Sequence, residues 1–160
     1  MDILEISSAD EMRTLGHTLS GTLQPGDVLV LTGPLGAGKT TFVQGLGTGL
    51  GVSGIVTSPT FVVARVHKAG QRGLGMVHVD AYRLESPDDV ADLDIDDESP
   101  HITVIEWGDS IIESITDSWL SVVIDRDSHS DDTSPENGIR RVTFTAHGPA
   151  WKHRSVEVST

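Results

Sequence analysis

A phosphate-binding loop is the pattern in this chain with the most specific chemistry. Residues 33–40 read Gly-Pro-Leu-Gly-Ala-Gly-Lys-Thr and match G-x-x-x-x-G-K-[ST] without a gap. Glycines let backbone N–H groups wrap closely around phosphates, and a following helix adds partial positive charge at its first turn. Lys39 supplies a mobile full charge. The pattern therefore predicts a nucleotide site. A chance match would need a coincidence of about one in a hundred at ordinary glycine frequencies.

Two carboxylates follow apolar runs and are candidates to complete a magnesium site. Magnesium beside a nucleotide takes oxygen ligands, usually the hydroxyl of the loop and a carboxylate at a strand end. Thr40 is the hydroxyl, and Glu106 follows the apolar run 102–105. Asp80 ends another apolar run and is a candidate to hold magnesium-bound water or to orient the attacking water. The alternatives are a surface glutamate at a strand end and an ordinary turn aspartate.

Three weaker patterns refine this hypothesis. Ser58-Pro59-Thr60 lies where a threonine often senses the γ-phosphate, although the same triplet is also typical of a plain turn. No Asn-Lys-x-Asp guanine signature occurs, which favours ATP over GTP. The seven histidines form no H-x-x-x-H pair, which argues against zinc. His78 alternates within an apolar strand and is expected to be packed rather than catalytic.

The elements that position these residues can be predicted from hydrophobic periodicity. Residues 27–32 form a short apolar strand before the loop, and Phe42, Leu46 and Leu50 mark one face of the helix after it. Glycines beyond residue 44 predict a frayed end to that helix. Ser8 and Glu11 fit a capping box for an earlier helix, and Ser86-Pro87 fits a later helix start. Further strands are expected at 3–6, 60–66, 74–79, 102–105, 120–124 and 141–145, with the second and third forming a hairpin.

Composition sets limits on the class of protein. The chain has 160 residues, a formal net charge of −13 and no cysteine. One domain is expected, a cytoplasmic location is predicted, and no apolar run approaches the roughly 20 residues of a membrane span. So acidic a surface repels a nucleic-acid backbone, which argues against direct DNA or RNA binding. Residues 85–98 carry eight acidic residues and neither lysine nor arginine. That run is either a solvated face or a docking surface for a basic partner.

Four sequence blocks together resemble one family. They are the loop and its continuation at 33–42, Ser-Pro-Thr-Phe at 58–61, His-Val-Asp-Ala-Tyr-Arg-Leu at 78–84, and Val-Ile-Glu-Trp at 104–107. In this order they look like the TsaE (YjeE) family, the small P-loop ATPases of bacterial tRNA threonylcarbamoyladenosine biosynthesis. H-x-D-x-Y-R-L followed by an E-W strand is far more specific than the loop alone.

The resemblance implies an α/β fold of P-loop NTPase type, with a mixed, mostly parallel sheet flanked by helices and a β-hairpin insert. It implies Mg-ATP as ligand, with magnesium at Thr40 and Glu106 and with Asp80 acting through water. Lys39, Asp80, Glu106 and the switch-like Thr60 are the implied catalytic residues. The implied nucleotide-binding residues are Leu35, Gly36, Ala37, Gly38, Lys39, Thr40, Thr41 and Trp107.

The resemblance also implies partners. They are the transferase that places threonylcarbamoyl on the adenosine beside the anticodon, and that transferase's paralogous subunit. ATP hydrolysis would reset the complex between turnovers, and tRNA would be held only through the complex. A nucleotide-gated binding module and a small-molecule kinase are the alternatives.

Some features depart from the family pattern or fall outside it. Arg65 and His67 occupy places where the family often has an acid and a tyrosine. No arginine lies in a recognisable finger motif, and Arg140 is a weak candidate to approach the nucleotide. We expect one ATPase domain over residues 1–146, followed by a flexible tail over residues 147–160.

Overall fold

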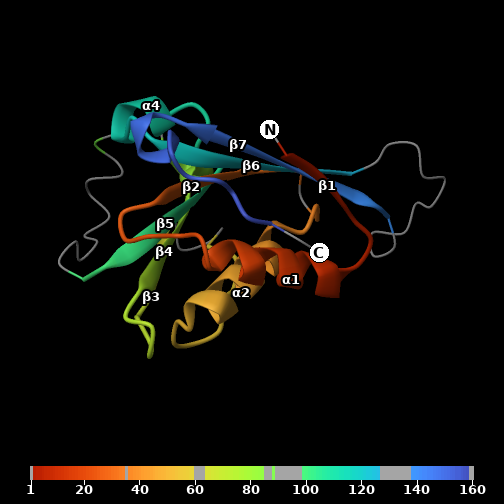
Figure 1. The fold of residues 1–160 in the computed structure, drawn as a ribbon, viewed down its shortest axis with the longest axis horizontal. Coiled ribbons are helices and arrows are strands. Elements are labelled where there is room, and N and C mark those ends of the chain that lie inside the picture. Colours follow the sequence, from red (N-terminus) through yellow and green to blue (C-terminus); the bar gives the residue numbers. More distant parts are fainter. Residues whose placement is uncertain are drawn as a thin grey trace.

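The computed structural model describes residues 2–34, 36–59, 64–84, 88, 99–126 and 138–158. Within these residues a seven-stranded sheet crosses the molecule, and two longer helices lie against one of its faces (Figure 1). The strands are β1 (Asp2–Ile6), β2 (Val28–Thr32), β3 (Ala64–His67), β4 (Gly75–Asp80), β5 (His101–Glu106), β6 (Trp119–Arg126) and β7 (Arg140–His147). The helices are α1 (Ala9–Ser20), α2 (Lys39–Leu50) and the short α4 (Ile112–Ile115), with 3-10 turns η1 (Ala81–Arg83) and η2 (Pro149–Trp151).

The sheet has a parallel centre and antiparallel edges. Its order is β1-β7-β6-β2-β5-β4-β3, in which β6, β2, β5 and β4 run parallel. At one edge β3 pairs antiparallel with β4, which confirms the predicted hairpin, and at the other β7 pairs antiparallel with β6 and β1. The predicted α/β fold, with a mixed sheet and a hairpin insert, is therefore confirmed.

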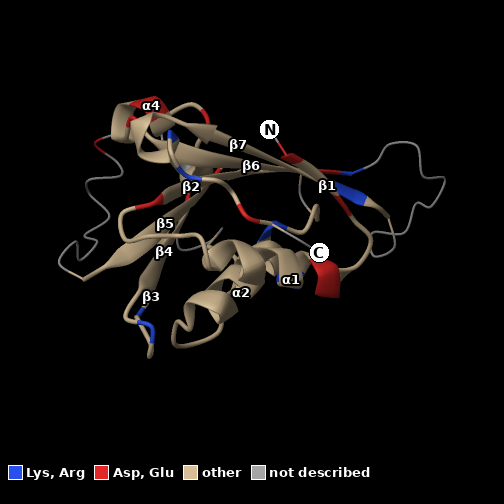
Figure 2. Ribbon diagram, in the orientation of Figure 1, with Lys and Arg blue, Asp and Glu red and all other residues tan. Residues whose placement is uncertain are grey.

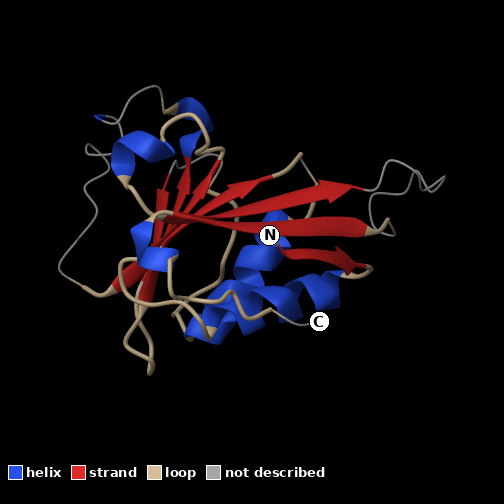
Figure 3. Cartoon of the chain, turned by 45° about the horizontal axis from the view of Figure 1, so that its top comes forward, coloured by secondary structure: helices blue, strands red, loops and turns tan. Residues whose placement is uncertain are grey.

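Helices α1 and α2 pack side by side on one face of the sheet (Figures 1 and 3). Glycines allow their close approach, because a Cβ on Gly16 would lie 2.2 Å from the Phe42 carbonyl oxygen and one on Gly45 would lie 2.0 Å from that of Arg13. The expected fraying of α2 is wrong. The helix continues to Leu50 and ends at Gly51 in a left-handed conformation with φ 72°, since helix–helix contact outweighs the low helix propensity of glycine.

Alternation along the central strands divides the buried residues between two faces. Leu29 and Leu31 of β2 join the large cluster under α1 and α2, whereas Val30 joins a smaller cluster with Ile105 and Ile112 on the opposite face. Both faces of the centre are therefore covered, as a parallel sheet requires.

The first helix begins where the sequence predicts, but its capping contact differs in one partner. Ser8 Oγ accepts the Glu11 backbone N–H at 3.1 Å, as in a capping box. The Glu11 carboxylate instead accepts from the backbone N–H of Ser7 at 2.7 Å and from its hydroxyl at 2.8 Å. The same contacts hold the pKa of Glu11 below its usual value.

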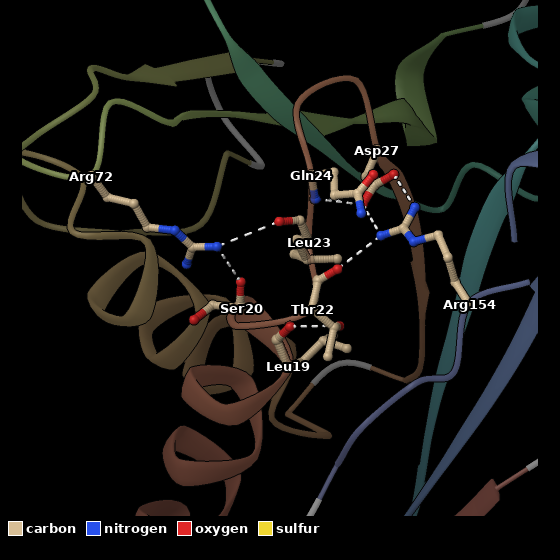
Figure 4. A network of polar contacts seen from close by, with 8 residues as sticks. All are labelled: Leu19, Ser20, Thr22, Leu23, Gln24, Asp27, Arg72 and Arg154. Atoms are coloured by element: carbon tan, nitrogen blue, oxygen red, sulfur yellow. Dashed lines mark hydrogen bonds and ion pairs between the residues drawn. The ribbon is translucent and has the colours of Figure 1, made fainter.

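Two arginines from distant parts of the chain hold the connection between α1 and β2 (Figure 4). Arg154 donates to both carboxylate oxygens of Asp27, at 2.8 and 2.7 Å, and to the carbonyl oxygen of Thr22. Arg72, from the turn of the hairpin, donates to the carbonyl oxygens of Ser20 and Leu23.

The segment beyond β7 packs against the domain. Trp151 is buried in the large cluster, and the Arg154 guanidinium lies 3.9 Å from its ring centroid. The flexibility expected for residues 147–160 stays a prediction. The helix expected from Ser86 falls almost wholly outside the described residues, with Asp88 alone described there as helical and exposed.

Candidate functional site

The carboxyl ends of the parallel strands bring the predicted site residues together. The phosphate loop follows β2, Asp80 ends β4 and Glu106 ends β5. The register pairs Glu106 with Leu31 on one side and with Asp80 on the other. In open α/β sheets ligands bind outside this edge. A cavity of about 600 Å³ opens there, lined by Gly36, Gly38, Lys39, Thr40, Thr41, Ser58, Asp80, Tyr82, Glu106 and Trp107.

The loop has the backbone geometry of an anion site. Gly36 and Gly38 take φ values of 77° and 113°, which favour glycine strongly. Gly38 is also the N-cap of α2, and no side chain in the described part of the chain caps that helix start. The N–H groups of the first turn therefore point toward the loop without a side-chain acceptor, as phosphate binding at a helix N-terminus requires.

Lys39 is folded back onto its own loop. Its Nζ donates to the carbonyl oxygens of Gly33 and Pro34 and lies 4.7 Å from the ring centroid of Trp107. Burial lowers the pKa of Lys39, and the negative charges of Glu106 and Asp80 oppose that shift. The lysine is thus a partly desolvated cation beside two carboxylates, at the entrance to the first turn of α2.

Trp107 closes this side of the cavity in an unusual conformation. It has φ 60°, a left-handed value that is rare for a residue other than glycine. Its ring meets Tyr82 edge to face, with ring centroids 6.1 Å apart. Tyr82 is 77% exposed and Trp107 38% exposed, so this aromatic pair also borders solvent.

The two candidate carboxylates have different surroundings. Asp80 Oδ1 accepts the Tyr82 backbone N–H at 3.0 Å and caps η1, so it fixes the turn that carries Tyr82. Glu106 Oε2 lies 2.7 Å from Nε2 of His78, which is fully buried in β4. His78 is packed, as predicted, and its contact with Glu106 is an additional finding. Period-two alternation on β4 and the parallel register with β5 would have placed both side chains on one face.

A second cavity, of about 470 Å³, lies on the other side of the loop. It shares Gly36, Gly38 and Thr41 with the first cavity and is also lined by the start of α1 and by Arg140. Arg140 Nε donates to the Ala37 carbonyl oxygen at 3.1 Å, and Arg126 Nη2 donates to that of Gly36 at 3.3 Å. Burial, with the nearby charge of Arg126, lowers the pKa of Arg140.

These two arginines extend the site beyond the sequence prediction. Arg140 is a weak candidate by its place before the last predicted strand, and no sequence motif indicates that Arg126 contacts the loop. They face each other across β6 and β7, and Figure 2 shows the basic positions at these strand ends. Like charges directly opposite in a sheet repel each other. Arg126 ends β6 and Arg140 begins β7, and these two strands are neighbours in the sheet. This position of the two residues is the signal in the sequence that could have indicated their approach to each other.

The donor set fits magnesium bound together with a nucleotide. Thr40 offers a hydroxyl and Glu106 a carboxylate to the same cavity, with Asp80 beside them, and oxygen ligands are what magnesium prefers. Within the described residues, no three His, Cys, Asp or Glu side chains form a metal site by themselves. A metal here would therefore take part of its coordination from phosphate oxygens and water. Thr60 and Leu35, two further predicted residues, lie outside the described residues.

Comparison with known proteins is consistent with this geometry. Residues 6–134 match the family described as Threonylcarbamoyl adenosine biosynthesis protein TsaE. A Streptomyces coelicolor protein named tRNA threonylcarbamoyladenosine biosynthesis protein TsaE is 48% identical over 92% of this chain and 98% of its own. A Bacillus subtilis protein with the same name is 35% identical over 94% of this chain and 89% of its own.

A solved structure shares the fold as well. The crystal structure of Bacillus subtilis YdiB superposes with a TM-score of 0.69 at 30% identity, over 92% of this chain and 86% of that one. Among the described residues, no helix has the length and apolar character to cross a bilayer. By its sequence along most of its length and by its fold, the chain belongs to the TsaE family.

Proposed function

We propose that this protein is a magnesium-dependent ATPase that acts in the biosynthesis of threonylcarbamoyladenosine in tRNA. The observation that carries the proposal is the meeting of the phosphate loop, Lys39, Asp80 and Glu106 at one edge of the sheet, around one cavity. The names of its relatives support the biosynthetic role.

Each residue has a defined task in this proposal. The N–H groups of the loop and of the first turn of α2 bind the β-phosphate, and Lys39 leaves the carbonyl oxygens of Gly33 and Pro34 to contact the β- and γ-phosphates. Thr40 and Glu106 would hold the magnesium ion. When bound, the ion neutralises charge that develops on the phosphate oxygens. Asp80 orients the attacking water or a water on the metal, with Thr60 proposed as the γ-phosphate sensor.

The two cavities fit the two ends of a nucleotide. The larger one contains the cation, the hydroxyl and the carboxylates, so the polyphosphate belongs there. The smaller one adjoins it across Gly36 and Gly38 and is lined by Ser8, Met12 and Arg140. Its mixed apolar and polar lining suits a nucleoside. Trp107 borders the phosphate side of the site.

The ATPase would work with partner proteins rather than on tRNA directly. The proposed partners are the threonylcarbamoyl transferase and its paralogous subunit, with ATP hydrolysis resetting that complex between turnovers. The net charge of −13 supports contact with tRNA through the complex only. We propose a cytoplasmic location because the tRNA substrate is found there.

A phosphate-release assay tests the proposal directly. The purified protein is incubated with γ-labelled ATP and Mg²⁺, with and without the two partner proteins and tRNA. Free inorganic phosphate that depends on Mg²⁺ is the expected product. Label on a small molecule would instead indicate a kinase, and tight ATP binding without any product would indicate a nucleotide-gated binding module. Multiple-turnover formation of the modified adenosine should require this protein and ATP.

A further inference from the structure

A buried histidine forms a direct hydrogen bond with the carboxylate assigned to magnesium. His78 is 0% exposed and Glu106 is 5% exposed, and Nε2 of the first lies 2.7 Å from Oε2 of the second. Both project from the helix-covered face of the sheet, because His78 alternates with Met76 and Glu106 with Val104, which belong to the cluster under α1 and α2. A short hydrogen bond between two buried groups fixes the rotamers of both.

The contacts of His78 assign its tautomer. A carboxylate oxygen accepts hydrogen bonds, so the ring must carry a proton on Nε2. Within the described residues Nδ1 is buried and has no partner. A proton there would be a buried donor without an acceptor, which is costly. The ring therefore acts as a single, fixed donor to Glu106 through Nε2–H.

We propose that His78 is a positioning residue that orients the Glu106 carboxylate for magnesium. Its Nε2–H occupies Oε2, so that Oε1 is the carboxylate oxygen that would bind the metal. The inference rests on the function proposed above. Hydrogen-bonded partners of metal ligands commonly set metal affinity by 10- to 100-fold. His78 itself touches neither nucleotide nor metal in this proposal.

Magnesium enhancement of ATP affinity tests this role without relying on turnover. It is defined as the ratio of the ATP dissociation constant in EDTA to that in saturating MgCl2, both measured by calorimetry. His78→Met fills a similar volume without a donor, and we expect it to lower the enhancement about 10-fold or more. Its ATP affinity in EDTA should stay within about twofold of the parent. His78→Gln, whose side-chain amide reaches the place of Nε2, should restore most of the enhancement.

Another buried histidine supplies a matched control. His67 on β3 is 7% exposed, and no hydrogen bond or ion pair joins it to Glu106 in the described structure. His67→Met makes the same chemical change one strand away and should leave the enhancement unchanged. In a Glu106→Gln background His78→Met should have no further effect on the enhancement, because the carboxylate that His78 orients is gone.

The outcomes separate this inference from the proposed function. If the parent binds ATP with no magnesium enhancement, the proposed function fails. If the parent shows enhancement and His78→Met retains it, or if His67→Met lowers it equally, the positioning role is wrong. Should His78→Met not fold, His78→Asn carries the same test against His78→Gln, because its shorter amide cannot reach Glu106.

Discussion

The Lys39 ammonium lies between the carbonyl oxygens of its own loop and the indole of Trp107. We predict that Lys39→Ala abolishes hydrolysis and weakens ATP binding at least 10-fold, because it removes the cation proposed to contact the β- and γ-phosphates. Burial already disfavours the charged form, as its lowered pKa indicates, so the free energy of unfolding should change by less than about 1 kcal/mol. Calorimetry with ATP and thermal unfolding check the two statements. Normal turnover by folded Lys39→Ala would contradict the assignment of the loop.

Substitutions of the carboxylates at the ends of β4 and β5 should lower ATP hydrolysis much more than ATP binding. Glu106→Gln and Asp80→Asn keep the shape of each side chain and remove its negative charge. We expect hydrolysis to fall about 100-fold or more, while ATP affinity in EDTA changes by no more than about threefold. The measurement is a magnesium titration of phosphate release. Activation curves that coincide with that of the parent would show that neither carboxylate acts through the metal.

His67 should make the stability of the fold depend on pH. Burial lowers the pKa of His67 below its ordinary value of 6.5, and the positive charge of Arg65 adds to that shift. The Nε2 atom of His67 is buried without a partner in the described structure. Lys68 and His101 line a cavity together with His67. Because the folded state favours the neutral ring, the stabilisation is complete above pH 6.5 and is lost as the pH falls through the lower pKa of the folded state.

Chemical denaturation between pH 7.5 and 5 checks this prediction. The parent should lose up to about 1.4 kcal/mol per pH unit through this group at the steepest point. In His67→Leu the pH slope should be smaller, whereas His153→Gln, at an exposed histidine, should keep the slope of the parent. Equal slopes in the parent and His67→Leu would show that another group is responsible.

At the scale of elements, the C-terminal segment contributes to stability through one ion pair. Arg154 and Asp27 form a two-point contact in which the side chains are only 18% and 7% exposed. We predict that Arg154→Gln lowers the free energy of unfolding by about 2–3 kcal/mol, because it leaves a buried carboxylate without its cation. That corresponds to roughly 4–12 °C in melting temperature for a domain of this size.

The control for this pair lies on α1. Arg13 pairs with Asp10, but these side chains are 48% and 96% exposed, so Arg13→Gln should cost less than about 0.5 kcal/mol. If the two variants melted at the same temperature, the contact between Arg154 and Asp27 would not stabilise the fold.

Strands and the phosphate loop could be predicted because their signals are local. Apolar runs and the G-x-x-x-x-G-K-T pattern depend on neighbouring residues alone, and the hairpin follows from two apolar runs around a glycine-containing turn. Fraying of α2 was a wrong prediction because Gly16 and Gly45 act through contact between helices, which propensity does not describe. The bond from His78 to Glu106 and the approach of Arg126 and Arg140 to the loop depend on strand pairing. Pairing joins residues that are distant in the sequence, so no local pattern indicates it.

At the scale of the whole molecule, acidity and the arrangement of arginines determine how the protein can meet its partners. Arg72 and Arg154 are engaged with backbone carbonyls or with Asp27 on the helix-covered side (Figure 4). Arg126 and Arg140 contact the phosphate loop. Several of the eleven basic residues therefore make contacts within the protein itself, and the chain carries 24 acidic residues. A partner with a basic surface is favoured by this balance, and bare tRNA is not.

The acidic residues around Asp88 are the proposed contact for the basic surface of the partner proteins. An arginine supplied to a phosphoryl-transfer transition state can raise the rate by about 10³–10⁵. Because the sequence contains no arginine-finger motif, the isolated protein should hydrolyse ATP slowly. The partner proteins should stimulate this hydrolysis. Replacing Asp88, Asp89 and Asp92 by lysine should reduce that stimulation and leave the basal rate unchanged. Asp88 is exposed, and the other two lie outside the described residues.

Salt dependence distinguishes contact through proteins from contact with RNA. In a filter-binding assay the isolated protein should show no tRNA affinity that varies with salt, because a chain with a net charge of −13 releases few counterions from the phosphate backbone. Stimulation by the partners should weaken as salt screens the acidic residues. Stimulation that survives the charge reversal would place the partner contact elsewhere on the molecule. Tight, salt-sensitive tRNA binding by the isolated protein would instead require a basic face that outweighs its overall charge, and the complex would then no longer be needed to hold the RNA.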